Sequence, residues 1–205
     1  MISHKYKCIF IHIPRTAGTY IEKLLVGKDY WEIDKRNKHL TASKAKTIYK
    51  KYWDKYFKFS FVRHPYTRTE SMMRYSNYFF GEEAIKKIRL EHINFYKQKF
   101  GFPNTIEFDY RFDKLTNYKH EKYSKNQIYS NILDERIDYI GKYENLDYDL
   151  NYIFKRLNFK LWKLKSLFIR NNEKRTDKIS TLNDQIKKEI FELYKNDFQK
   201  FGYEK

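Results

Sequence analysis

The feature that most constrains the fold is a short, unbroken apolar segment followed at once by a polar loop and an amphipathic segment. Residues 7–13, K-C-I-F-I-H-I, are continuous and rich in branched side chains, as the buried strands of parallel sheets are. Similar segments occur at 57–62, F-K-F-S-F-V, and at 137–142, I-D-Y-I-G-K. Strands that alternate with helices predict an α/β fold with a mainly parallel central sheet flanked by helices.

Apolar residues with helical spacing follow these strands. After the first strand, Ile21, Leu24 and Leu25 show this spacing. Further helices are predicted at 41–56 with Thr41 or Ser43 as N-cap, near Tyr66, at 82–100, from Asn145, and at roughly 183–200. The inward faces of the last two comprise Leu146, Leu150, Ile153, Phe154 and Leu157, and then Ile186, Ile190, Leu193 and Phe198. Residues 101–130 follow no pattern that places an element.

The length and composition fit one folded domain. The chain has 205 residues, of which 41% are hydrophobic and 20% aromatic, enough to build a core. We expect a single domain over residues 1–205. The single cysteine, Cys8, excludes an intramolecular disulfide and lies in an apolar segment, which predicts a core residue.

The charge balance restricts the classes of partner. Lys and Arg number 43 against 26 Asp and Glu, a net charge of +17, which attracts nucleic acid, acidic glycans, anionic membranes or phosphorylated cofactors. A basic composition with lysines spread along the chain also occurs without such a role. No segment is long enough to span a membrane, and the first residues lack a signal-peptide pattern. These features predict a cytoplasmic location.

The loop after the first strand, P-R-T-A-G-T at 14–19, has the components of an anion site. Gly18 permits a tight turn, the following helix offers unpaired N–H groups, and Arg15 adds a fixed positive charge. Thr16 and Thr19 add hydroxyl donors. The loop lacks the G-x-x-x-x-G-K-S/T pattern of a Walker A motif. An ordinary strand-to-helix turn remains the alternative.

The second strand ends in a similar loop, F-V-R-H-P-Y-T-R-T-E-S at 61–71. Arg63 stands at the carboxyl end of the strand, and Pro65 is suited to begin a helix. Ser71 follows in that helix, so Arg63 and Ser71 could approach one phosphate from two sides. Ligands of open α/β sheets bind at the carboxyl ends of strands, where both loops fall.

Together these loops resemble those of the PAPS-dependent sulfotransferases, in particular the carbohydrate type that includes the heparan and uronyl 2-O-sulfotransferases. That family typically has I-P-K-T-A-G-T-S where this chain has I-P-R-T-A-G-T-Y at 13–20, and F-V-R-N-P-Y-x-R-x-x-S where it has 61–71. The segments K-H-L-T-A at 38–42, D-Y-I-G-K-Y-E-N-L at 138–146 and D-F-Q-K-F-G-Y at 197–203 also resemble family elements. The ordered matches cover nearly the whole chain.

The resemblance implies a P-loop-like fold and the donor 3′-phosphoadenosine 5′-phosphosulfate (PAPS), without a metal. Residues 15–19 would hold the 5′-phosphosulfate, and Arg63 with Ser71 the 3′-phosphate. The donor-binding residues implied are Arg15, Thr16, Ala17, Gly18, Thr19, Tyr20, Arg63, Ser71, Lys174 and Arg175.

Two residues are expected to act in catalysis. Arg15 stands where most relatives have Lys, and a cation there would stabilise charge that develops on the leaving group. Arg does not readily give up a proton, so transfer would be impaired if the family Lys protonates the leaving group. His39 matches the proposed catalytic His of the family and would act as the base; a surface His is the alternative. His12 is interpreted as a buried, satisfied residue.

The predicted activity is transfer of a sulfuryl group from PAPS to a hydroxyl group of a carbohydrate acceptor. The positive net charge of the chain favours an acidic acceptor. Three alternatives stay open: a sulfotransferase-fold protein that binds the donor without turnover, a P-loop-type kinase, and a basic nucleic-acid-binding module. Nucleic acid is not the expected partner, and acceptor contacts are expected from residues 72–130. The sequence does not indicate an oligomeric state.

Overall fold

The computed structural model describes residues 1–71, 128–159, 182 and 184–205. The described residues fall into two compact units, one comprising 1–63 with 129–159 and the other 64–71, 128, 182 and 184–205. The helix expected at 82–100, the segment 72–127 and residues Lys174 and Arg175 lie outside the described residues.

The first unit is built around a four-stranded sheet with the order β1-β2-β3-β4. Its strands are β1 (Ile2–Ser3), β2 (Cys8–Ile11), β3 (Phe57–Val62) and β4 (Tyr139–Lys142). β2, β3 and β4 are parallel, with Phe10 beside Phe59 and Phe61 beside Gly141, whereas β1 pairs antiparallel with β2. The prediction of an α/β fold with a mainly parallel sheet is confirmed. The short strand β1 was not predicted.

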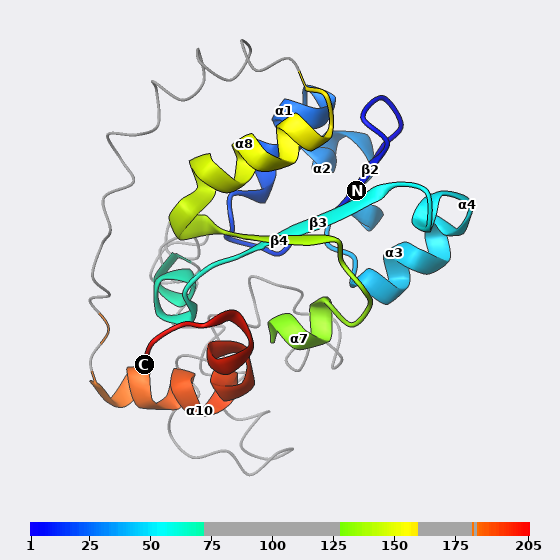
Figure 1. The fold of residues 1–205 in the computed structure, drawn as a ribbon. Helices are drawn as coiled ribbons and strands as arrows, with labels where there is room; N and C mark the ends of the chain where they lie inside the picture. The colour runs from blue at the N-terminus through cyan, green and yellow to red at the C-terminus, as the bar shows by residue number, and fades with distance from the viewer. Residues whose placement is uncertain (72–127, 160–181, 183) are drawn as a thin grey trace. The chain divides into compact units, whose positions relative to one another are not determined.

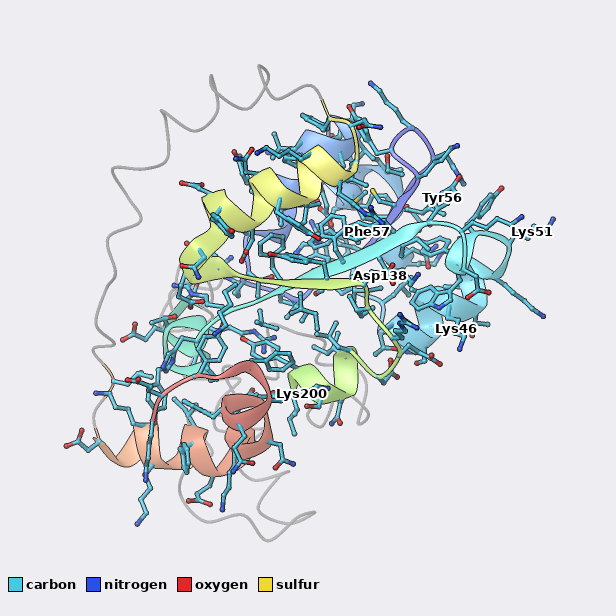
Figure 2. All side chains as sticks on the ribbon, viewed as in Figure 1. Lys46, Lys51, Tyr56, Phe57, Asp138 and Lys200 are labelled. Atoms are coloured by element: carbon cyan, nitrogen blue, oxygen red, sulfur yellow. The ribbon has the colours of Figure 1, made fainter. Side chains whose placement is uncertain are left out.

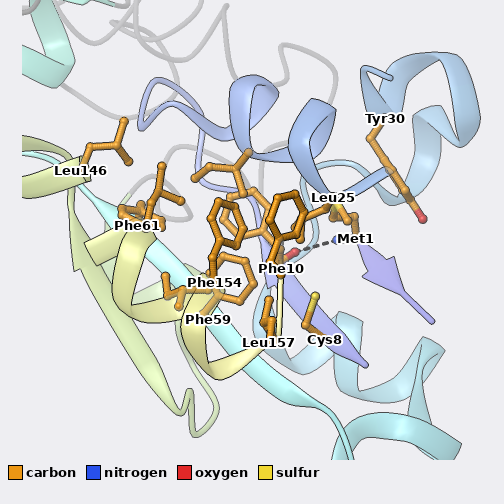
Figure 3. Close-up of a cluster of buried hydrophobic side chains, with 14 residues drawn as sticks. Met1, Cys8, Phe10, Leu25, Tyr30, Phe59, Phe61, Leu146, Phe154 and Leu157 are labelled. Carbon is orange, nitrogen blue, oxygen red and sulfur yellow. Dashed lines mark hydrogen bonds between the residues drawn. The ribbon is translucent and has the colours of Figure 1, made fainter. Parts of the chain in front are cut away.

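Helices accompany these strands in the first unit (Figure 1). They are α1 (Gly18–Val26), α2 (Tyr30–Ile33), α3 (Ala42–Ile48), α4 (Lys50–Trp53), α7 (Tyr129–Ile132) and α8 (Leu146–Arg156), with the 3₁₀ turns η1 (Lys35–Asn37) and η3 (Tyr143–Asn145). α1 and α8 lie on the same side of the sheet. Phe10 and Phe59 of the strands pack there against Leu25 of α1 and Phe154 of α8 (Figure 3).

The prediction of one continuous helix over 41–56 is wrong, because the segment forms two helices, α3 and α4. Thr41 caps α3, its hydroxyl accepting from the N–H of Lys44, as one of the two expected N-caps. Tyr49 then leaves helical geometry, with φ −102° and ψ 26°, and α4 begins at the next residue. Tyr49 and Trp53 are both buried, so the break changes the course of the chain without exposing either ring.

The chain before β4 is tied to earlier elements by polar contacts. Asp134 accepts from the N–H and hydroxyl of Ser43 at 2.8 and 2.6 Å, and Lys46 pairs with Glu135 at 2.9 Å. Asp138 accepts from the backbone N–H of Lys58 at 2.8 Å and pairs with its ammonium group at 2.9 Å. Lys46 and Asp138 are labelled in Figure 2. These contacts fix the register of β4 against β3.

In the second unit, a helical segment at 65–71 and α10 (Asp184–Phe201) share a small apolar cluster. The cluster comprises Tyr66, Ile190, Tyr194 and Phe198. The extent of the terminal helix is confirmed, but the prediction that Leu193 faces inward is wrong, since its side chain is 39% exposed. Tyr194, where the helix kinks with φ −106°, is buried instead, four positions from both Ile190 and Phe198.

Candidate active site

The loop between β2 and α1 has an unusual backbone. Arg15 and Ala17 both have a φ of 67°, the left-handed conformation that residues other than glycine rarely adopt. Such strain is found most often at ligand-binding sites. Ala17 is the N-cap of α1 and makes no side-chain hydrogen bond to the first turn of the helix. The loop therefore leads into a helix N-terminus whose amides have no side-chain cap and are suited to an anion.

Two residues of the loop serve its own shape. Thr16 is fully buried, and its hydroxyl donates to the carbonyl of Ile13 at 2.8 Å, so this hydroxyl braces the turn. At Gly18, a Cβ atom would lie 2.0 Å from Cδ2 and Nε2 of His12. The glycine is thus required by the imidazole behind it, in addition to any approach of a ligand. Arg15, Thr19 and Tyr20 are half-buried.

Beneath the loop lies a cluster of titratable residues, which we call the support cluster: His12, Glu22 and Lys38, which are buried, and Asp29, which is partly buried. The carboxylate of Glu22 accepts hydrogen bonds from His12 Nδ1 at 2.5 Å and from the backbone N–H of Tyr30 at 3.1 Å. It also forms an ion pair with Lys38 Nζ at 3.1 Å. Lys38 also contacts Asp29 closely and donates to the Thr19 hydroxyl at 3.3 Å. Its three N–H groups thus have three acceptors. The cluster connects α1, the start of α2 and the residue before His39.

Burial controls the protonation of this cluster. It lowers the pKa of His12 well below its ordinary value, and the positive charge of Lys38 acts in the same direction. Burial raises the pKa of Glu22, against the hydrogen bonds from Tyr30 and Lys38. His12 is therefore neutral and donates its Nδ1 proton to Glu22. The prediction that His12 is a buried, satisfied residue is confirmed.

His39 lies beside the loop, with its ring 4.4 Å from that of His12 between centroids. Its Nδ1 is 3.1 Å from the carbonyl oxygen of His12. Because a carbonyl only accepts, Nδ1 carries the proton and Nε2 keeps its lone pair. Burial lowers the pKa of His39 to about 3, and neighbouring His12 contributes. His39 is thus a neutral imidazole in the tautomer that a base acting through Nε2 requires.

Arg63 reaches the same loop from the end of β3. Its Nη1 donates to the carbonyl of Arg15 at 3.5 Å, and its guanidinium carbon lies 4.1 Å from the ring centroid of Tyr143. The hydroxyl of buried Tyr129 accepts from the backbone N–H of Arg63 at 3.2 Å and donates to its carbonyl at 2.5 Å. The structure therefore brings Arg63 to the backbone of Arg15, and it places His39 against His12, the last residue before the loop's Ile13. Ser71 belongs to the other unit, so its role with Arg63 stays a prediction.

Sequence reasoning missed Glu22, Lys38, Tyr129 and Tyr143. A signal for Glu22 was present: Gly18, Ile21, Glu22 and Leu25 form the buried stripe of α1, so the carboxylate occupies a core position. Tyr143 lies within the segment 138–146 that resembles a family element. The contact of its ring with Arg63 could not be predicted without the fold. Among the described residues, no group of three or more His, Cys, Asp or Glu could hold a metal ion.

Comparison with known proteins identifies the family of the chain. The sequence model of the sulfotransferase family matches residues 1–204. The chain belongs to the sulfotransferase family. It is 25% identical over 237 aligned positions to proteins named carbohydrate sulfotransferase 11 of Rattus norvegicus and of Mus musculus, with 99% of this chain and 66% of each relative covered. No solved structure matches the chain. The predicted resemblance to carbohydrate sulfotransferases is confirmed.

The comparison also corrects one prediction. The matched relatives are Golgi membrane enzymes, so the cytoplasmic location inferred from the sequence is wrong. The inference relied on the ends of a chain that spans about 66% of the length of these relatives. Within the described residues, no helix is long and apolar enough to cross a membrane.

Proposed function

We propose that this sulfotransferase moves a sulfuryl group from PAPS to a hydroxyl group of a carbohydrate. The observation that carries the proposal is the strained loop at the end of β2, where an α1 N-terminus without a side-chain cap, Arg15 and the guanidinium of Arg63 meet. The family supports the reaction type, and the printed name of the matched relatives supports a carbohydrate acceptor.

The residues at the loop fit a donor that carries several phosphate oxygens. Backbone amides and two guanidinium groups are anion ligands that need no metal. The carboxylates of Glu22 and Asp29 are engaged by Lys38 beneath the loop, which limits their repulsion of an anion. We assign residues 15–20 to the phosphosulfate, and Arg63 with Ser71 to the 3′-phosphate. Lys174 and Arg175 remain proposed donor contacts.

Arg15 supplies the charge stabilisation. PAPS, when bound, provides the sulfuryl group and a nucleotide phosphate as leaving group. The guanidinium of Arg15 holds a permanent positive charge where negative charge grows in the transition state, which lowers the barrier. Arg15 retains its protons, because the pKa of a guanidinium stays far above neutrality. Its role is therefore electrostatic, and the leaving group departs as an anion.

His39 is proposed to take the proton from the acceptor hydroxyl at Nε2. The hydrogen bond from Nδ1 to the carbonyl of His12 holds the ring in one orientation and one tautomer. With a pKa of about 3 the imidazole is already in its basic form at neutral pH, although it is a weak base. Anions held by Arg15 and Arg63 would raise this pKa and strengthen the base when the site is filled.

The experiment that tests the proposal is calorimetric titration of the whole chain with 3′-phosphoadenosine 5′-phosphate in metal-free buffer. We expect binding that Arg63→Ala weakens by about tenfold or more, because charge-assisted hydrogen bonds contribute about 1.5–3 kcal/mol. Arg156→Ala is the matched control, since Arg156 is exposed at the end of α8 and should leave affinity unchanged. Failure of the wild-type chain to bind would refute the proposal.

Companion measurements of binding and turnover separate the alternatives. Binding of magnesium–ATP in preference to the bisphosphate would favour a kinase. DNA binding with a steep salt dependence, and no response to the nucleotide, would favour a nucleic-acid-binding module. Donor binding without transfer to any glycan hydroxyl would identify a protein in which Arg15 no longer supports turnover. Undiminished turnover after His39→Ala would exclude His39 as the base.

A further inference from the structure

Trp31 is a large aromatic side chain exposed beside the proposed base. It lies in α2, next to Tyr30, which is buried, yet the indole itself is 46% exposed. Single exposed apolar residues are common on protein surfaces and need no explanation. What distinguishes Trp31 is its neighbour: the ring of His39 lies 5.9 Å away between centroids, at an interplanar angle of 71°.

The support cluster fixes the position of Trp31. Asp29 caps α2, its carboxylate accepting from the backbone N–H of Trp31 at 2.9 Å. The ammonium group of Lys38 lies 5.7 Å from the centroid of the indole, within the range of a cation–π contact. Asp29 and Lys38 are themselves joined by an ion pair. Trp31 is thus anchored to the same buried group that underlies the phosphate loop and adjoins His39.

An anchored, half-exposed indole next to a base suits one class of ligand. A pyranose ring has a face of C–H groups, which is apolar and slightly positive, whereas the face of an indole is apolar and slightly negative. Hydroxyl groups project from the rim of the sugar. A sugar stacked on Trp31 would therefore bury its apolar face and present a hydroxyl at the edge, where His39 lies.

We propose that Trp31 is the stacking platform for a pyranose ring of the acceptor and that it brings one hydroxyl of that sugar to His39. The inference rests on the proposed sulfuryl transfer and adds the recognition element for its acceptor. It places acceptor binding partly within α2, whereas the sequence indicated only residues 72–130 for this role.

The test measures binding of a sugar independently of turnover. The full chain, saturated with 3′-phosphoadenosine 5′-phosphate, is titrated with unsulfated hexasaccharides of alternating uronate and N-acetylhexosamine, in the glucosamine and the galactosamine series, and the heat of binding is recorded by calorimetry. We expect saturable binding of at least one series by the wild type. Trp31→Ala should raise its Kd about tenfold, whereas Trp31→Phe, which keeps an aromatic face, should stay within about threefold.

Two controls make the result specific. Trp53→Phe alters a buried tryptophan of α4 and should leave glycan affinity unchanged. The affinity of every variant for the bisphosphate, measured without glycan, should equal that of the wild type. Equal glycan affinity in Trp31→Ala and the wild type, or no binding of either series by the wild type, would overturn the inference. Absence of bisphosphate binding by the wild type would instead overturn the proposed function.

Discussion

Arg15 and Arg63 follow neighbouring parallel strands, yet the chain fixes them by different means. The loop that carries Arg15 rests on the support cluster, in which Glu22 and Lys38 are almost completely buried and joined by an ion pair. Arg63 is instead held by two tyrosines: the hydroxyl of Tyr129 is hydrogen-bonded to its backbone, and the ring of Tyr143 lies against its guanidinium group. Removing one partner of a buried ion pair lowers the free energy of unfolding strongly, because the other charge stays buried without a partner. Removing an aromatic or a hydrogen-bonded contact lowers it less. Substitutions in the support of Arg15 should therefore lower stability more than substitutions in the support of Arg63.

The largest effect is expected from Glu22→Ala. The change leaves Lys38 and His12 buried without their shared carboxylate, which should lower the free energy of unfolding by about 3–5 kcal/mol. Urea denaturation followed by circular dichroism measures this. Glu135→Ala, which breaks a partly exposed pair with Lys46, is the matched control and should cost at most about 1 kcal/mol. Equal losses in the two variants would show that the support cluster contributes no more than a surface pair.

A smaller effect is expected from Tyr129→Phe. This change removes the hydroxyl that accepts from the backbone N–H of Arg63 and donates to its carbonyl, and should cost about 1–3 kcal/mol of stability. Affinity for 3′-phosphoadenosine 5′-phosphate should fall with it, because Arg63 loses its fixed backbone. Denaturation and calorimetry on the same preparation give both values. A stability loss with unchanged affinity would show that the hydroxyl does not position Arg63.

Tyr143→Leu should affect binding more than folding. It removes the aromatic face beneath the guanidinium of Arg63, a contact contributing about 0.5–1 kcal/mol, so nucleotide affinity should fall by about two- to fivefold. Tyr143→Phe keeps the face and should bind as the wild type does. If the leucine and phenylalanine variants bind equally well, the stacking is incidental.

No change at all is expected in the protonation of His39 between pH 5 and 8. Its pKa of about 3 lies below that interval, so the imidazole should remain neutral with its proton on Nδ1. Long-range nitrogen–proton NMR spectra report the tautomer directly, and His39→Ala assigns the signal. A titration near pH 6.5 would indicate that the ring is solvated and leaves the carbonyl of His12.

Much of the fold could be predicted because its signals are local. Continuous apolar segments predicted the three parallel strands, and helical spacing predicted the face of α8, whose five expected residues are all buried. The break at Tyr49 and the exposure of Leu193 could not be read in this way. Both depend on the elements that each helix meets in the fold, which the spacing of its own residues does not display.

The candidate site was predicted where a residue acts by its own chemistry. Arg15, Gly18, His39 and Arg63 carry charge, flexibility or basicity that the sequence displays. The hydroxyl of Thr16, expected as a donor to an anion, instead donates to the carbonyl of Ile13. The supports of these residues could not be predicted, because Lys38 and Glu22 are 16 positions apart and only the fold pairs them. The tautomer of His39 likewise depends on a carbonyl 27 residues away.

The contact between His12 and residue 18 has a consequence for interpreting variants. The imidazole fills the space that any side chain at position 18 would need, so the two positions share one volume. The cost of a substitution at 18 is then not a property of that position alone; it should shrink when residue 12 is made small. A scan that changes one residue at a time would attribute to nucleotide contact a penalty that belongs in part to the neighbouring ring.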